Sequence, residues 1–305
     1  METRLRNLLP QYKRISFQSK YYPDIMFSCD CCPCSLIIGA IVVFVLYKLF
    51  CCKRCCKRQP ELLEKNYKKD VVYLYQFPRA STIPNVSPYC LKVEAFLRLN
   101  KIDYESRFSI KARSKHGLLP FIELNGEQIA DSQIIEEKLK KHFNIEPLSD
   151  YDESLSRAAS RLISHHTTSV VSKYRYVDET DSVVDTFFEL ASLNQYSFLK
   201  PFAVWFIRRK SLKKLKSFGL FSDSEFDMLL RKDLDVLKGL LGEKNYLLGD
   251  KISNLDASIF GHVATWYYMP QKGYVARVLD EDYKSIVAWL ERVKTDLFPT
   301  DFTKN

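Results

Sequence analysis

The sequence predicts an α/β fold between residues 71 and 143, and three observations support that prediction. Residues 71–77 are a run of β-branched and aromatic side chains, which is typical of a buried strand. Ser87, followed by a proline and an amphipathic run, has the pattern of an N-cap, an N1 proline and a helix. An Asn-Gly pair at 125–126 favours the tight hairpin turn that requires positive φ.

The elements of this segment are expected in a fixed order. The first strand leads through a proline-containing loop to the helix after Ser87, and two further strands follow. Because only the Asn-Gly turn separates the third strand from the next run, these two are expected to pair as a hairpin. A helix opened by an Asp-Ser pair completes the unit. The expected boundaries are 71–77, 88–99, 104–108, 121–124, 127–129 and 131–143.

Two parts of the sequence resemble a known family. Residues 73–79 together with 87–94 resemble the failed-axon-connections family, which is close to the metaxins and to the cadmium-responsive proteins of nematodes. Further along, residues 246–250 and 253–257 resemble the capping segment that precedes the central helix in the all-α domain of glutathione transferases. The two matches stand in the order and at the spacing of that fold.

The resemblance implies the glutathione transferase fold, with α/β and all-α parts. Its thioredoxin-like N-terminal half would be residues 71–145 and its helical C-terminal half residues 150–297. In the helical half, Ser253 and Asp256 form a capping-box-like pair, with Asp in place of the usual Glu. We interpret this pair as structural.

The net charge is distributed unevenly along the chain. The formal charge is +9 over 305 residues, of which residues 1–70 contribute +7 and the remainder +2. Because the remainder is close to neutral, the charge does not indicate a nucleic-acid partner. The basic excess lies beside an apolar stretch, which is typical of a protein that meets a membrane surface.

That apolar stretch, residues 31–52, predicts one transmembrane helix. Twenty-two helical residues span ~33 Å, enough for a hydrocarbon core of ~30 Å, and Lys48 can place its ammonium at the interface. A buried globular helix and a signal peptide are the alternatives, although about 30 mostly polar residues before the stretch argue against a signal peptide. The polar segment 1–30 would precede the helix, and a basic, cysteine-rich linker, 53–70, would follow it.

The orientation follows from the basic residues beside this stretch. Only Lys20 lies close on the N-terminal side, whereas seven basic residues follow on the C-terminal side. The positive-inside rule therefore places the folded part in the cytosol, as a single-pass membrane protein. The lipid bilayer is then one partner, and a second copy of the chain or a membrane protein is an open candidate for another.

Eight of the nine cysteines flank the apolar stretch. The two clusters lie ~25 Å apart along a helix, so they cannot share a metal ion, and adjacent cysteines entering a helix are poorly placed to close a tetrahedral site. S-acylation beside basic residues is the favoured interpretation of the second cluster, metal binding and inert interfacial residues being the alternatives. The residues concerned are Cys51, Cys52, Cys55 and Cys56.

Ser87 is the candidate catalytic residue. At a helix N-terminus its hydroxyl would lie beside unsatisfied amides and the positive end of the helix dipole. In related transferases a hydroxyl at this turn contacts the glutathione sulfur and favours the thiolate, whose free thiol titrates near ~8.5. The alternative is a helix cap alone. The turn also resembles the Cys-Pro-Tyr-Cys turn of glutaredoxins with Ser87 replacing the first cysteine, which disfavours thiol–disulfide exchange and leaves Cys90 as a packed residue.

Two further pairs are implied by the resemblance as a glutathione site. Leu119 and Pro120 stand where this fold has a cis-proline, which presents the preceding backbone to the cysteinyl group. Asp131 and Ser132 match the acidic-Ser pair that holds the γ-glutamyl end, with helix capping as the alternative. Residues 111–117 depart from common transferase patterns, which leaves glutathione binding open.

Two other features of the sequence have competing interpretations. His165 and His166 are adjacent on a predicted helix and so do not share a face, which makes a metal pair unfavourable. The basic run 208–216 follows three aromatic residues, and a solvated helix face is favoured over a lipid-facing patch. No metal site is expected, and glutathione is the candidate ligand.

Two classes of function remain. In the first, the protein is a binding or scaffold module, as the metaxin and failed-axon-connections resemblance implies, acting in metal or toxic stress or in neuronal development. In the second, it is an active glutathione S-transferase in which Ser87 activates the thiol. The fold prediction supports both equally.

Overall fold

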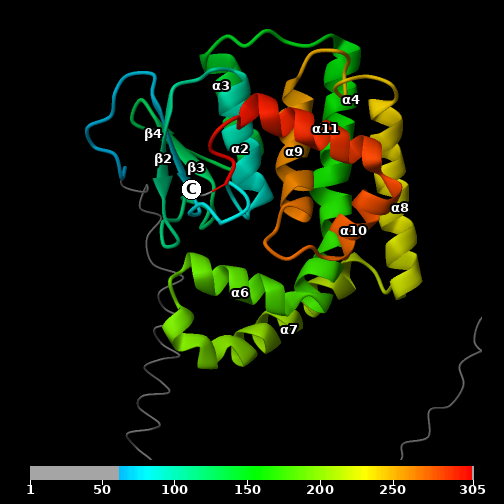
Figure 1. The fold of residues 1–305 in the computed structure, drawn as a ribbon. Helices are drawn as coiled ribbons and strands as arrows, with labels where there is room; N and C mark the ends of the chain where they lie inside the picture. Colours follow the sequence, from blue (N-terminus) through cyan, green and yellow to red (C-terminus); the bar gives the residue numbers. More distant parts are fainter. Residues whose placement is uncertain (1–61, 304–305) are drawn as a thin grey trace, which may run out of the picture. The chain divides into compact units, whose positions relative to one another are not determined.

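The computed structural model describes residues 62–303, which all belong to one structural unit. The α/β half predicted from the sequence is followed by a helical half, and the two pack together (Figure 1). The predicted transmembrane segment 31–52, the cysteine clusters and most of the linker lie outside the described residues. Within 62–303, no helix is long and apolar enough to cross a membrane.

The sheet of the α/β half has four strands in the order β2-β1-β3-β4. β1 pairs in parallel with β2 and antiparallel with β3, and β3 pairs antiparallel with β4 across the predicted hairpin. Asn125 and Gly126 of that turn have φ of 49° and 80°, as the sequence predicts. The strands are β1 (Val72–Gln76), β2 (Tyr104–Phe108), β3 (Phe121–Leu124) and β4 (Glu127–Ala130).

Two helices, α2 (Pro88–Leu99) and α3 (Ser132–His142), cover one face of the sheet (Figure 1). Their buried side chains share a core with alternate residues of β1, such as Val72 and Leu74, while the intervening Tyr73 and Tyr75 belong to a separate cluster on the other face. The predicted boundaries of every strand and both helices agree with the structure to within about two residues.

The helical half surrounds one central helix, α9, in which 13 of 14 residues are buried. α9 crosses α2 closely, since a Cβ on Gly261 would lie 2.5 Å from the Lys92 amide nitrogen. This close approach explains the glycine in a buried helix. The helices are α4 (Asp150–Arg161), α5 (Thr168–Lys173), α6 (Thr180–Leu190), α7 (Lys200–Phe218), α8 (Asp223–Leu241), α9 (Asn254–Tyr267), α10 (Tyr274–Asp282) and α11 (Lys284–Leu297).

Three short irregular helices interrupt this half. The segments η1 (Leu162–Thr167) and η2 (Tyr174–Asp178) are π-helical turns on either side of α5, and η3 (Asn194–Leu199) is a 3₁₀ segment before α7. His165 and His166 lie in η1. π-Turns widen a helix locally and are frequent beside functional sites.

The predicted capping box before α9 is confirmed. Ser253 Oγ accepts from the Asp256 amide, and the Asp256 carboxylate accepts from the Ser253 amide at 2.9 Å. Asp256 also accepts from the Leu247 amide at 2.9 Å and from Trp289 Nε1 at 2.8 Å. One fully buried carboxylate therefore joins the preceding loop, α9 and α11.

The C-terminal residues return to the α/β half. Glu94 of α2 is fully buried and receives hydrogen bonds from Arg79 at 2.8 Å and Arg98 at 3.1 Å. Both arginines also bind the carboxylate of Asp301. This network secures the chain after α11 against α2.

Candidate functional site

The candidate site residues gather at one end of the sheet. In the strand register, Phe121 pairs with Tyr75 of β1 on one side and with Ala130 of β4 on the other. The carboxyl end of β1, Pro120 before β3 and Asp131 after β4 therefore meet at this end of the sheet. Strand pairing thus brings together positions as far apart in the sequence as Gln76, the last residue of β1, and Asp131.

The loop between β1 and α2 places Ser87 at the same end. Asn85 is fully buried, and its Nδ2 donates to Gln76 Oε1 at 3.2 Å and to the Phe77 carbonyl oxygen at 2.9 Å. Its Oδ1 accepts from the Ser87 amide at 3.0 Å. One asparagine side chain thus holds Ser87 against the last residues of β1.

Ser87 occupies the N-cap position of α2, but its side chain makes no capping hydrogen bond. Its carbonyl oxygen accepts from the Leu91 amide at 3.0 Å. Of the described residues, none accepts a hydrogen bond from the amides of Tyr89 or Cys90. Helix capping alone therefore does not account for Ser87, and two first-turn amides remain at the positive end of the dipole.

Cys90 lies three residues after Ser87, in the first turn of α2, and is fully buried. Burial raises the pKa of its thiol to about 12, which outweighs hydrogen bonding from the Ser87 side chain and the Phe77 amide. The thiol is therefore protonated at neutral pH and is a packed side chain, as predicted. Within residues 62–303, no group of three His, Cys, Asp or Glu side chains could hold a metal ion.

At the neighbouring helix N-terminus, Asp131 caps α3. Its Oδ1 accepts from the Gln133 amide at 2.9 Å and from the Ile134 amide at 3.3 Å, with Asp131 itself at a φ of 77°. Its carbonyl oxygen accepts a hydrogen bond from the Ile135 amide. Among the first four amides of α3, only that of Ser132 has no acceptor in the described part of the chain.

The peptide bond between Leu119 and Pro120 is cis, as the resemblance implied. Pro120 is buried and Leu119 is half-buried beside the aromatic residues of β1 and β3. All five predicted site residues therefore lie at or next to one end of the sheet. Their part in binding glutathione remains a prediction.

Tyr89 of α2, which the sequence did not single out, contacts the helical half. Tyr89 is 38% exposed and stacks edge-on against His262 of α9, with ring centroids 5.3 Å apart. Burial, with the charges of Tyr176 and Asp131, raises the pKa of Tyr89. The Tyr89 hydroxyl lies 3.5 Å from the Ser164 carbonyl oxygen of η1. Tyr89 stood in the predicted turn and could have been flagged there, whereas its neighbours on other helices gave no sequence signal.

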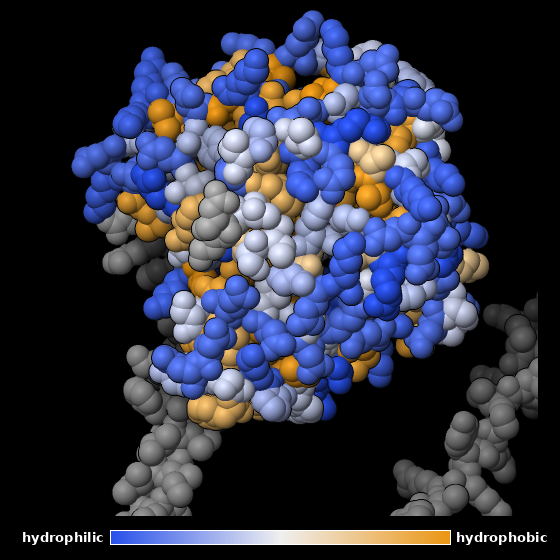
Figure 2. All heavy atoms as spheres, in the orientation of Figure 1, coloured by the Kyte–Doolittle hydropathy of each residue, from blue (hydrophilic) through white to orange (hydrophobic). Residues whose placement is uncertain are grey.

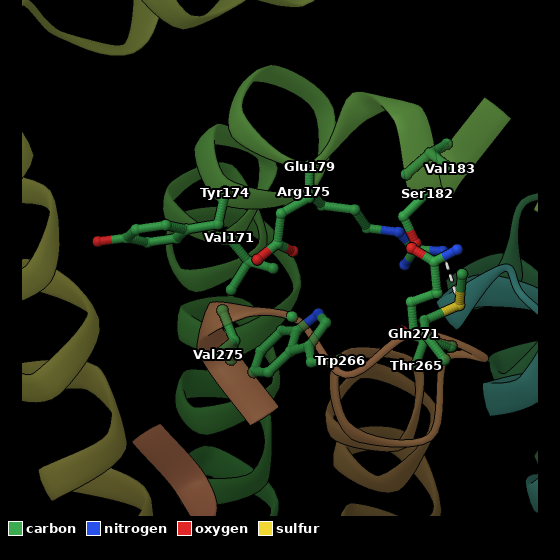
Figure 3. A pocket seen from close by; sticks show the side chains of 12 residues that line it. Val171, Tyr174, Arg175, Glu179, Ser182, Val183, Thr265, Trp266, Gln271 and Val275 are labelled. Atoms are coloured by element: carbon green, nitrogen blue, oxygen red, sulfur yellow. Dashed lines mark hydrogen bonds between the residues drawn. The ribbon is translucent and has the colours of Figure 1, made fainter. Parts of the chain in front are cut away.

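One residue of the helical half also reaches the Ser87 loop. Arg175 of η2 donates from Nη2 to the Val86 carbonyl oxygen at 3.1 Å and lies 3.3 Å from the Met269 sulfur. Figure 3 shows this side chain extended across a small cavity towards Gln271. That cavity is about 30 Å³, which is room for water but not for a tripeptide. Its lining thus supports the loop and is not itself the ligand site.

Two family models match the chain. The glutathione S-transferase N-terminal domain matches residues 88–181, and the glutathione S-transferase C-terminal domain matches residues 230–293. The matched segments include α2, β3, α3 and α9, which form the candidate site and its support. Residues 182–229 lie between them.

Two characterised relatives span most of the chain. Failed axon connections of Drosophila melanogaster is 31% identical over 259 residues, which are 77% of this chain and 60% of that protein. This chain therefore matches less than two thirds of the length of that relative. An isoprene-epoxide--glutathione S-transferase of Rhodococcus sp. (strain AD45) is 28% identical over 242 residues, covering 73% of this chain and 98% of the enzyme.

Solved structures agree on the fold. A glutathione S-transferase of Ceriporiopsis subvermispora in complex with glutathione superposes with a TM-score of 0.52 at 18% identity, covering 76% of this chain and 100% of that one. The beta-etherase LigF from Sphingobium sp. strain SYK-6 gives 0.50 at 17% identity, with 73% and 94% covered. The chain belongs to the glutathione S-transferase-like family and is a homologue of Failed axon connections.

Proposed function

We propose that the α/β half binds glutathione at the sheet end formed by Ser87, Pro120 and Asp131, and that the protein acts as a binding or scaffold module. The observation on which this depends is the N-terminus of α2, where Ser87 leaves the first-turn amides uncapped. A helix N-terminus with unsatisfied amides favours an anion, and the thiolate of glutathione is one.

Ser87 can donate to that thiolate while it remains beside Cys90. Because the Cys90 thiol stays protonated, it is not a second thiolate that competes with the ligand sulfur for the Ser87 hydroxyl proton. A hydrogen bond to a charged group contributes about 1.5–3 kcal/mol. This interaction favours the thiolate over the thiol and lowers the pKa of the bound glutathione.

The other end of glutathione carries a carboxylate in its γ-glutamyl group. Asp131 accepts from the Gln133 and Ile134 amides but not from that of Ser132. The Ser132 amide, at the positive end of the α3 dipole, is therefore the donor available to the γ-glutamyl carboxylate. The Asp131 carboxylate itself is used in capping, so its role is to orient this helix end. Binding therefore uses two helix N-termini that the sheet holds side by side.

A binding role is favoured over thiol transfer because the turn has no reactive cysteine. Disulfide exchange needs an accessible thiolate, and the thiol of Cys90 is buried with a raised pKa. The relative named Failed axon connections supports a role in neurons. A role in metal or toxic stress is part of the same proposal, as is anchorage by residues 31–52 with the described unit in the cytosol.

A conjugating transferase is the second candidate. The isoprene-epoxide--glutathione S-transferase supports it, because this chain covers nearly the whole of that enzyme. Tyr89, next to Ser87 and 38% exposed, faces the helical half, where an electrophile could approach the sulfur. In this case the thiolate held by Ser87 attacks an epoxide carbon, a C–S bond forms as the ring C–O bond breaks, and the resulting alkoxide takes a proton from water.

The test is the ultraviolet absorbance of the glutathione thiolate, titrated against pH with the full-length protein. Bound glutathione should ionise at a lower pH than free thiol, which titrates near ~8.5, and Ser87→Ala should return it towards that value. Ser81→Ala is the matched control, because Ser81 is an exposed serine of the same loop. An unshifted titration in the parent protein would refute the site. If the titration is shifted, turnover of an epoxide by the parent protein would favour the transferase over the binding module.

A further inference from the structure

Helix α7 presents an unusual outer face. Its inward positions, which include Ala203, Val204 and Ile207, are half-buried, and none of its 19 residues is fully buried. The opposite side exposes residues at helical spacing, and we call these residues the α7 stripe. The α7 stripe consists of Phe202, Trp205, Phe206, Arg209, Leu212, Lys213 and Lys216.

The N-terminal end of the α7 stripe is aromatic. Phe202, Trp205 and Phe206 are 65%, 55% and 53% exposed, and their rings form a contiguous group. Phe202 lies 5.8 Å from Trp205 and 6.4 Å from Phe206, while Arg209 lies over the Trp205 ring at 5.7 Å. Just before the helix, Phe198 of η3 is 74% exposed. Such a group of exposed aromatic side chains marks an interaction surface.

The C-terminal end of the α7 stripe is basic. α7 contains seven Lys and Arg residues and no Asp or Glu. Two of the seven form ion pairs with α6, Lys200 with Asp185 at 2.6 Å and Arg208 with Asp181 at 3.5 Å. The other five have no carboxylate partner within residues 62–303; these are Arg209, Lys210, Lys213, Lys214 and Lys216.

The surrounding surface extends this pattern. A groove of about 1120 Å³ runs between α6 and α7 and is lined by Trp205, Phe206 and several of the basic residues. Figure 2 shows apolar atoms bordered by hydrophilic ones at the lower end of the molecule, where Figure 1 places α6 and α7. All of α7 falls within residues 182–229, between the two segments matched by the family models.

We propose that the α7 stripe docks on the surface of a bilayer that contains anionic phospholipids. Aromatic rings enter the headgroup boundary with their apolar edges, and unpaired lysines and arginines attract the lipid phosphates and carboxylates. An acidic protein would satisfy the basic residues but would leave a large part of the aromatic cluster in water. A nucleic acid is disfavoured because residues 71–305 carry a formal charge of only +2. A lipid surface satisfies both, and the inference depends neither on residues 31–52 nor on the glutathione site.

Trp205 provides a local test in the full-length protein. The chain has three tryptophans, and the other two, Trp266 and Trp289, are 5% and 0% exposed. With vesicles of phosphatidylcholine and phosphatidylserine, Trp205 emission should shift to shorter wavelength and be quenched by lipids brominated on their acyl chains. Phosphatidylcholine alone should give neither effect, and added salt should weaken the response. Trp205→Phe should abolish the signal and so identify its source.

Charge reversal separates the α7 stripe from general electrostatics. Lys213→Glu with Lys216→Glu should weaken the response to anionic vesicles at least about tenfold, because each basic residue near such a surface contributes about 1 kcal/mol. Lys251→Glu with Lys284→Glu is the matched control, since both lysines are exposed and lie outside α7. Phe202→Ser should reduce the bromolipid quenching without changing the charge.

Two results would overturn the inference. Quenching that is equal in the two kinds of vesicle, or lost equally in the control pair, would show that α7 does not recognise an anionic lipid surface. The second result is protection of Trp205 from iodide quenching by a soluble polyanion such as polyglutamate, with no protection by anionic vesicles. That result would assign the α7 stripe to an acidic macromolecule instead.

Discussion

Arg175 in the helical half donates a 3.1 Å hydrogen bond to the carbonyl oxygen of Val86, the residue immediately before Ser87. The two residues are 89 positions apart in the sequence. The helical half therefore helps to set the position of the turn from which α2 begins. The proposed glutathione site is accordingly a property of both halves, although its residues all belong to the first.

Arg175→Ala should weaken glutathione binding about five- to tenfold, because the turn loses one hydrogen bond of about 1 kcal/mol or slightly more. Calorimetry should show this change in affinity, and hydrogen exchange should increase at the amides of residues 86–91. Arg277→Ala is the control, since Arg277 is exposed on α10. Equal glutathione affinities for Arg175→Ala and the parent protein would show that the Arg175–Val86 hydrogen bond does not influence the site.

Cys90 should resist alkylation in the folded protein at pH 8. Burial raises the pKa of its thiol to about 12, so very little thiolate exists at that pH and access to it is closed. Peptide mapping after treatment with iodoacetamide should find Cys90 unmodified until denaturant is added. Rapid labelling of this peptide in the native protein, or disulfide reduction that persists in Cys90→Ser, would contradict the account of the turn.

His262 should make stability depend on pH below neutrality. Burial, with the charges of Lys92 and His165, lowers its pKa to about 3, whereas an unfolded histidine titrates near ~6.5. The unfolded chain therefore binds more protons between these values, so the stability is fully present above pH ~6.5 and is lost as the pH falls towards 3. The slope is about 1.4 kcal/mol per pH unit.

The measurement is urea unfolding at several pH values between 7 and 4 for the parent protein and for His262→Gln. Carboxylates also titrate in this range, but they are common to both proteins. The difference between the two unfolding free energies should therefore shrink as the pH falls. Parallel curves would show that His262 is accessible to protons in the folded state.

Asp256→Ala should destabilise the protein by about 3 kcal/mol or more. The change removes the acceptor for the Leu247 amide and for Trp289 Nε1, and each buried donor left unsatisfied costs about 1–3 kcal/mol. Ser253→Ala removes only the cap of α9 and should cost about 1 kcal/mol. Denaturant unfolding measures the loss of stability in both variants. A similar loss in the two would show that Asp256 contributes only the cap of α9.

Local patterns predicted the α/β half closely. The strand over 72–76 and the hairpin at Asn125-Gly126 depend on side-chain type and turn chemistry within a few residues, so the sequence contains the necessary information. Ser87 was likewise located correctly at the start of α2. That its hydroxyl makes no capping bond could not be predicted, because Asn85 and Cys90, its neighbours in the folded turn, determine its environment.

Contacts between distant segments account for what the sequence did not reveal. Tyr89 meets His262, 173 residues away, only because α2 packs on α9. The π-helical turns η1 and η2 have no distinct periodicity. For α7, the sequence favoured a solvated basic face over a lipid-facing one, since periodicity alone cannot tell which side of a helix the fold covers. The structure exposes the aromatic residues together with the basic ones, which led to the proposal for the α7 stripe.

Isothermal titration of glutathione into the full-length protein tests the central claim most directly. The account predicts saturable binding at one site per chain, weakened about tenfold or more by Ser87→Ala, in line with the loss of one donor to a charged partner worth about 1.5–3 kcal/mol. Ser81→Ala should bind as the parent does. Absence of saturable binding in the parent protein, or identical affinities for Ser87→Ala and Ser81→Ala, would contradict the claim that this sheet end is a glutathione site.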